Sequence, residues 1–146
     1  NPRIQKITAI LLTAKTKGKN PEKIARDAVK EIGWGDTQKG ALTTTAIIRN
    51  LTIAEKLGST TPEDVAKMRR GNAATVRRGP YTGDILSVDH IIPRSIAPSL
   101  DNTIANLELM PLRVNQSKGN KVGARQRDLA KKLHAAGLLE NPDLSE

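Results

Sequence analysis

Aromatic side chains are almost absent from this chain, and their absence restricts the kind of core it can form. The 146 residues include Trp34, Tyr81 and no phenylalanine. The core must therefore be built from isoleucine, leucine, valine and alanine, with the two aromatic rings packed against it. So few rings also argue against single-strand nucleic-acid binding by base stacking, which needs several of them. The lack of cysteine excludes disulfide bonds, a thiolate nucleophile and cysteine-ligated zinc.

The charge balance of the chain is strongly basic. Its 24 lysines and arginines outnumber 15 aspartates and glutamates, which gives a formal charge of +9 and a pI near 10.1. This balance favours a polyanionic partner, with nucleic acid as the first candidate and an inert basic surface as the alternative. No stretch approaches the roughly 18 apolar residues of a membrane span. We therefore expect DNA as the partner, most simply duplex, with RNA left open and no membrane.

The start of the sequence gives limited information on processing and location. Residues 7–15, ITAILLTAK, are too short and too interrupted by polar residues for a signal peptide. The first residue is Asn1 rather than methionine, so we expect a fragment or a processed form. We expect a bacterial or phage protein, with the cytoplasm slightly favoured and a secreted or periplasmic location left open.

Helix signals dominate residues 1–78. Asn20 before a proline, followed by apolar residues at helical spacing, predicts a helix that ends near Gly33. A second apolar pattern predicts a helix over 41–57. Thr61, again before a proline, predicts a third helix with Thr61 as cap and Asp64 in the reciprocal position.

The pattern changes after the Gly79-Pro80 pair, where β-branched and alternating stretches begin. Proline removes a backbone donor and so limits each predicted strand. We expect a strand over 85–92 before Pro93, a loop over 97–102 and a second strand over 106–110 before Pro111. After them we expect a helix from about Leu112, another helix over 123–133 and a polar tail over 137–146.

The predicted fold class is α+β. We expect one domain over 1–146, with a mostly helical and basic portion over 1–78. Residues 79–136 would form two short antiparallel strands with a following helix and a further C-terminal helix. Neither an internal repeat nor a low-complexity linker divides the chain.

Three features of the second half suggest chemistry: the Asp89-His90 pair, Asn106 and Asn115. Phosphodiester cleavage needs an activated water, neutralised charge in the transition state and assistance to the leaving oxygen. Neutral histidine suits the first task, and a divalent cation suits the other two. Asp89 offers an anionic oxygen and Asn115 a neutral one, and an oxygen-only set favours Mg²⁺, with Mn²⁺ also possible. Neighbours on a strand point to opposite faces, so Asp89 and His90 could serve ion and water separately.

The stretches VDHIIPRS, NLELMP and NQSKGNK resemble the motif of HNH (ββα-metal) endonucleases over about residues 86–121. The resemblance implies that His90 is the general base and that Asp89 and Asn115 are metal ligands. It also implies that Asn106 stabilises the loop between the strands and helps to hold the histidine. Asparagine in the last position is similar to the nicking domain of RNA-guided CRISPR nucleases, which supports Mg²⁺. The cysteine pairs that bind structural zinc in many members are absent, so no structural zinc is expected.

Simpler interpretations exist for each residue taken alone. Asp89 and His90 could be a surface pair at a strand end, and asparagine at position 106 commonly opens strands and turns. Asn115 could be a helix cap, in which case Asn120, or less well Asn102, would compete for the ligand role. The second histidine, His134, is expected to be structural.

Eight basic residues are candidates for nucleic-acid contacts. Arg94 is the strongest, because the motif places it beside the active-site loop. The others follow the motif or flank the Gly-rich joint near Gly71 and Gly79, where a solvated surface is the alternative interpretation. They are Lys118, Lys121, Arg125, Arg69, Arg70, Arg77 and Arg78.

The sequence therefore predicts a metal-dependent HNH endonuclease acting on DNA. Two alternatives remain at this point: a non-catalytic nucleic-acid-binding module on the same scaffold, and a secreted toxin-type nuclease with an immunity protein as partner.

Overall fold

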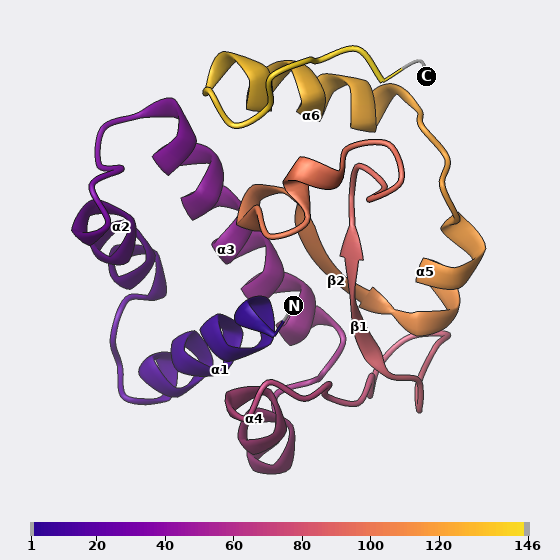
Figure 1. Ribbon diagram of the computed structural model, residues 1–146. Coiled ribbons are helices and arrows are strands. Elements are labelled where there is room, and N and C mark those ends of the chain that lie inside the picture. Colours follow the sequence, from indigo (N-terminus) through magenta and orange to yellow (C-terminus); the bar gives the residue numbers. More distant parts are fainter. Residues whose placement is uncertain (1, 145–146) are drawn as a thin grey trace.

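The computed structural model describes residues 2–144 and confirms the α+β fold class (Figure 1). Helices surround one small antiparallel sheet. In Figure 1 the first three helices lie on one side of the sheet, the fifth lies on the other, and the sixth crosses above it. The elements are α1 (Arg3–Thr16), α2 (Pro21–Glu31), α3 (Gln38–Lys56), α4 (Pro62–Arg69), β1 (Leu86–His90), η1 (Pro98–Leu100), η2 (Ile104–Asn106), β2 (Leu107–Pro111), α5 (Leu112–Lys118) and α6 (Ala124–Ala135).

Two of the predicted helix starts in the first half, those of α2 and α4, are confirmed by their caps. The Asn20 side chain accepts hydrogen bonds from the backbone N–H groups of Glu22 and Lys23. Thr61 and Asp64 form the reciprocal capping box at the start of α4. The third helix, α3, begins three residues earlier than predicted, because Thr37 rather than a later residue caps it.

The first helix was not predicted as a separate element. Its buried residues include Ile4, Thr8, Leu11 and Leu12, which recur at helical spacing. Two polar residues within this face, Gln5 and Thr8, weaken the pattern in the sequence, although both are buried. None of the helices in residues 2–144 is long and apolar enough to cross a membrane.

The sheet contains β1 and β2 alone, and β1 is shorter at both ends than the predicted strand over 85–92. Its antiparallel register pairs Leu86 with Pro111 and His90 with Leu107. Strand β1 was expected to continue to residue 92, but it ends at His90, because the Asn106 side chain binds the backbone of Ile92 and turns the chain away. The prediction that Pro111 closes the second strand was wrong by one residue, since Pro111 is its last paired position.

Two apolar cores hold the sheet between helices. The first combines α1 and α3 with strand residues Leu86, Leu107 and Leu109. The second places Ile92 and Leu100, from the connection between the strands, against α6. The Asn50 side chain of α3 joins the helix to the strand directly, by donating to the Leu107 carbonyl (3.0 Å) and accepting from the Leu109 N–H (2.7 Å).

The end of the chain is not a purely polar tail. Within the predicted tail, Leu139 and Leu144 are buried and pack against the second core. His134 has the expected structural place, with Nδ1 3.0 Å from the Leu139 carbonyl oxygen. Positions 145 and 146 of that prediction lie outside the described residues. Trp34 and Tyr81 pack against the first core, as predicted.

Candidate active site

A cavity of about 370 Å³ lies where β1, the loop after it and α5 meet. It brings together Asp89, His90 and Asn115, three of the four residues predicted for catalysis or metal binding. Asp89 and His90 are neighbours in sequence, and both line this one cavity. The lining residues are Val88, Asp89, His90, Pro93, Arg94, Asn115, Gly119 and Asn120.

Asp89 is buried and one of its carboxylate oxygens has no hydrogen-bond donor. The residue is 5% exposed. Lys118 Nζ lies 3.4 Å from Oδ1 and 3.2 Å from Oδ2, but only the first contact is aligned as a hydrogen bond. Burial raises the pKa of Asp89, Lys118 offsets part of this rise, and nearby Glu108 adds to it. A buried carboxylate that is costly to ionise and retains an unsatisfied oxygen is suited to a further cation.

Lys118 is the last residue of α5 and points into the site rather than towards solvent. Besides Asp89, its ammonium group donates to the carbonyl oxygens of His90 (3.0 Å) and Ile91 (3.3 Å). Its side chain is 18% exposed. The sequence predicted that Lys118 contacts a phosphate. In the structure its ammonium group already has three oxygen partners within the chain, in Asp89, His90 and Ile91.

His90 is oriented by Asp101, a residue that sequence reasoning missed. Nε2 of His90 lies 3.1 Å from the Asp101 carbonyl oxygen. A carbonyl oxygen can only accept, so Nε2 carries the proton and Nδ1 of the neutral ring is left with a lone pair. The Asp101 carboxylate oxygen Oδ1 is also 3.1 Å from Nε2, without hydrogen-bond alignment, and 2.8 Å from Arg94 Nε.

Asn106 supports the loop that follows the histidine. Its amide oxygen accepts from the Ile92 N–H (2.8 Å) and its amide nitrogen donates to the Ile92 carbonyl (3.1 Å). The residue is 0% exposed and therefore does not reach the cavity. This geometry fits the expected supporting role, in which Asn106 acts through the backbone next to His90.

Asn115 lies in the middle of α5, so the alternative interpretation as a helix cap is wrong. Its amide nitrogen donates to Ser87 Oγ (3.2 Å) and to the Val88 carbonyl (3.4 Å). These contacts fix the plane of the amide and leave its oxygen as the group that could bind a cation. Asn120, the alternative ligand, lines the same cavity.

A buried carboxylate on β2 was also missed by sequence reasoning. Glu108 lies opposite Asp89 in the sheet register and is 7% exposed. Arg125 binds it through two hydrogen bonds, of 2.9 and 2.5 Å. Arg49 Nε of α3 lies 3.2 Å from the same carboxylate. The alternation of residues along β2, the strand paired with β1, could have indicated Glu108 from the sequence. Its two partners, Arg125 and Arg49, come from distant helices and depend on the tertiary fold.

The other basic residues that were predicted to contact nucleic acid lie in several separate parts of the structure. Arg94 is exposed beside the cavity and pairs with Asp101, and Lys121 is exposed nearby. Arg77 forms a bidentate pair with the fully buried Asp64, at 2.7 and 3.0 Å. The remaining three are exposed residues remote in sequence from the motif, and their role in binding stays a prediction: Arg69, Arg70 and Arg78.

The donor set of the cavity fits a hard divalent ion with few protein ligands. Residues 2–144 contain no group of three or more histidine, cysteine, aspartate or glutamate side chains placed to hold a metal. A carboxylate oxygen without a hydrogen-bond donor and a fixed amide are both oxygen ligands. Mg²⁺ typically binds through one or two such groups and keeps several waters. The residues present therefore fit the ion that the sequence predicted.

Comparison with known proteins supports this assignment for one segment. Residues 80–124 match the family model described as HNH endonuclease. No curated protein and no solved structure matches the chain. The matched segment contains both strands, α5 and the cavity residues, which confirms the predicted resemblance to HNH endonucleases for this part of the chain and supports nuclease activity.

Proposed function

We propose that this protein is a metal-dependent endonuclease that hydrolyses phosphodiester bonds in DNA. The observation that carries the proposal is the convergence of Asp89, His90 and Asn115 on one cavity, with a buried carboxylate oxygen that lacks a donor. Each group matches one requirement of phosphodiester hydrolysis.

His90 would act as the general base. Because Nε2 is engaged by the Asp101 carbonyl, Nδ1 is the atom that would take the proton from the attacking water. Asn106 holds the backbone immediately after the histidine, so the ring is carried by a rigid segment. The Asp101 carboxylate lies close enough to stabilise the positive charge that the ring acquires.

Asp89 and Asn115 would hold the divalent ion, with Mg²⁺ as the expected species. When bound, the ion would neutralise charge on the phosphate and assist departure of the 3′ oxygen. Lys118 Nζ lies 3.2 Å from the Asp89 carboxylate, on the same side of the site. Arg94 at the cavity rim would contact a backbone phosphate.

Duplex DNA is the proposed substrate, on the grounds of the basic charge and the scarcity of aromatic side chains. Backbone contacts by arginine and lysine bind nucleic acid with little dependence on sequence and with strong dependence on salt. We therefore expect cleavage with little sequence preference.

The test is cleavage of supercoiled plasmid, with linear duplex, single-stranded DNA and RNA in parallel, each with Mg²⁺ or with EDTA. The parent protein should cut duplex DNA with Mg²⁺ and stop in EDTA. Replacing His90 by alanine should lower the rate by about 10²–10⁴-fold, the usual contribution of a general base. DNA binding should remain nearly intact.

His134 provides a matched control because it is the second of two histidines in the chain. His134→Ala should cut at a rate close to that of the parent protein at a temperature where it is folded. Parental cutting by the His90→Ala protein would remove His90 as the base. Undiminished cutting in EDTA would remove the metal-dependent mechanism.

A further inference from the structure

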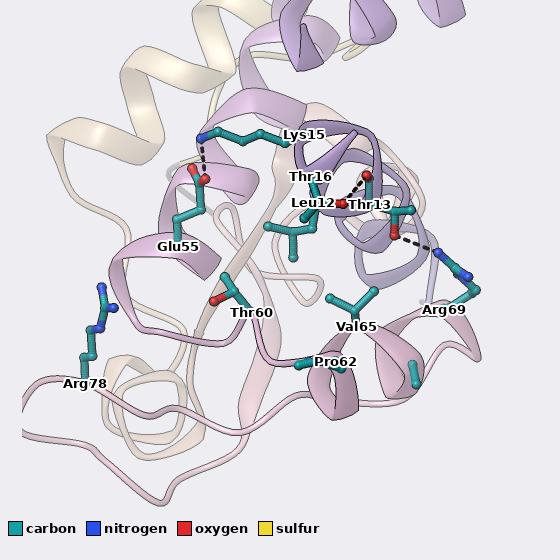
Figure 2. Close-up of a pocket in the computed structure, with 11 residues that line it drawn as sticks. Leu12, Thr13, Lys15, Thr16, Glu55, Thr60, Pro62, Val65, Arg69 and Arg78 are labelled. Carbon is teal, nitrogen blue, oxygen red and sulfur yellow. Dashed lines mark hydrogen bonds and ion pairs between the residues drawn. The ribbon is translucent and has the colours of Figure 1, made fainter. Parts of the chain in front are cut away.

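A second and larger pocket, of about 670 Å³, lies on the helical part of the molecule. Figure 2 shows it between the second half of α1, the end of α3 and α4, with Arg78 of the following segment at one side. None of its lining residues lines the candidate active site. The volume lies in the range of pockets that enclose ligands of the size of a nucleotide.

The lower part of this pocket is aliphatic. Leu12 of α1 faces Pro62, Val65 and Ala66 of α4 across it, as Figure 2 shows for the labelled side chains. Leu12 is buried, whereas Ala66 at the opening is exposed. A flat apolar group could cover this surface and remove it from water.

The rim of the pocket carries an excess of positive charge. Lys15 is neutralised by Glu55, the one carboxylate of the lining, at 2.5 Å. Arg69 donates to the hydroxyl of Thr13 (2.7 Å), a neutral group that leaves its charge uncompensated. The Arg78 guanidinium has neither a hydrogen bond nor an ion pair with any residue of the described chain. Two uncompensated guanidinium groups thus lie on different sides of one aliphatic surface (Figure 2).

Guanidinium groups and an aliphatic surface together match the chemistry of a nucleotide unit. The planar fork of arginine suits phosphate oxygens. A base can cover aliphatic side chains, although without an aromatic partner it gains burial rather than stacking energy, so no base preference is expected. An acidic peptide would match the charges but leave the aliphatic surface uncovered by its carboxylates.

We propose that this pocket binds an unpaired nucleic-acid strand outside the cleavage site, with one base over Leu12 and Val65 and flanking phosphates on Arg69 and Arg78. The inference relies on the proposed function only for the choice of a nucleic acid as the polyanion. A second contact of this kind would let the helical half hold an unpaired strand next to the duplex on which the HNH segment acts.

The test locates binding directly by methyl NMR in EDTA, where no cleavage occurs. A single-stranded oligonucleotide of about eight nucleotides is titrated into the parent protein. The methyl signals of Leu12, Val65 and Ala66 should shift together. Ile10, which is on α1 but 55% exposed on another face, serves as the control and should remain in place. A poly-glutamate peptide of equal charge should not reproduce the shifts.

Affinity measurements then test the two arginines. Arg69→Glu combined with Arg78→Glu should weaken oligonucleotide binding about tenfold and lower its dependence on salt, since two phosphate contacts are lost. The matched control combines Lys23→Glu with Arg26→Glu on α2, which makes the same change in net charge at two exposed residues. It should weaken binding much less.

Three outcomes would overturn the inference: unmoved pocket methyls, equal losses in both double variants, or equal shifts with poly-glutamate. These outcomes differ from failure of the proposed function, because no arm depends on cleavage. A protein that cuts DNA but shows no pocket shifts refutes the pocket alone. A protein that shows the shifts but never cuts refutes the nuclease alone.

Discussion

Nζ of Lys118 lies 3.2 Å from Oδ2 of Asp89, so the carboxylate at the centre of the candidate site has a cation beside it in the folded chain itself. Both side chains are largely buried, at 18% and 7% exposure. Lys118 closes α5 and Asp89 belongs to β1, so the pair also joins the helix to the first strand. The contact thus has consequences for stability as well as for charge in the cavity.

Lys118→Met should destabilise the protein by about 2 kcal/mol, because it leaves a buried carboxylate without its partner. Asp89→Asn introduced together with it should recover most of this loss. Urea unfolding of the two single variants and the double variant measures the coupling energy. Additive effects of the two substitutions would show that the pair contributes nothing to folding.

Asp89→Asn alone should raise the stability of the protein at neutral pH. Burial raises the pKa of Asp89, and Lys118 compensates for this only in part. When the pKa of a carboxyl group is higher in the folded than in the unfolded state, its contribution to stability is fully present below the unfolded pKa of about 3.9. This contribution is lost as the pH rises through the folded pKa. The difference in Tm between variant and parent should thus be positive at pH 7 and narrow towards pH 4, and a constant difference would contradict this account.

Mg²⁺ should raise the Tm of the parent protein, because a ligand that binds only the folded state stabilises it. At about one hundred times the dissociation constant the gain is roughly 2.7 kcal/mol. Asp89→Asn should abolish the response and Asn115→Ala should reduce it. Asp27→Asn on α2 is the matched control, since it makes the same chemical change at an exposed site, and it should respond as the parent does. An undiminished response in Asp89→Asn would place the ion elsewhere.

Local features of this fold could be predicted from the sequence, because they depend on residues that are close along the chain. The caps at Asn20 and Thr61 involve partners two or three residues away. The motif around Asp89 and His90 was also recognisable, since its chemistry is carried by residue types at fixed spacing.

The features that sequence reasoning missed depend on tertiary contacts. The strand ends at His90 because the Asn106 side chain, 14 residues after Ile92, binds the Ile92 backbone. Asp101 reaches His90 only through the path of the loop between the strands. The basic residues show the same limit, because a charge on a predicted surface can be taken up by a buried carboxylate such as Asp64. Charge counting alone cannot separate such an arginine from one that is free to bind phosphate.

Arg77→Ala should destabilise the protein by about 1–3 kcal/mol at neutral pH, because it leaves the fully buried Asp64 carboxylate without its ion pair. Burial by itself would raise the pKa of Asp64, but hydrogen bonds from Arg77 and its other partners outweigh it and hold that pKa below its ordinary value. A lowered pKa gives stability above the unfolded pKa that is lost as the pH falls through the folded pKa. The loss caused by Arg77→Ala should therefore shrink in acid.

Arg78→Ala is the neighbouring control, and it should change the free energy of unfolding by no more than about 0.5 kcal/mol. Thermal or urea unfolding of both variants between neutral and acidic pH measures the contrast. Equal effects of the two substitutions would show that the bidentate pair with Asp64 is not a main contributor to stability.

Asn106→Ala should slow cleavage by more than the loss of folded protein explains. The reason is that the Asn106 amide holds Ile92, two residues after His90. Asn50→Ala is a suitable comparison, because Asn50 is also fully buried and also bonds twice to strand backbone, but on β2 and away from the histidine. Each substitution should cost roughly 1–3 kcal/mol of stability through unsatisfied backbone groups. Single-turnover cleavage at a temperature where both variants are folded should then be slower for Asn106→Ala than for Asn50→Ala. Equal rates would mean that the Asn106 clamp stabilises the fold without positioning the base.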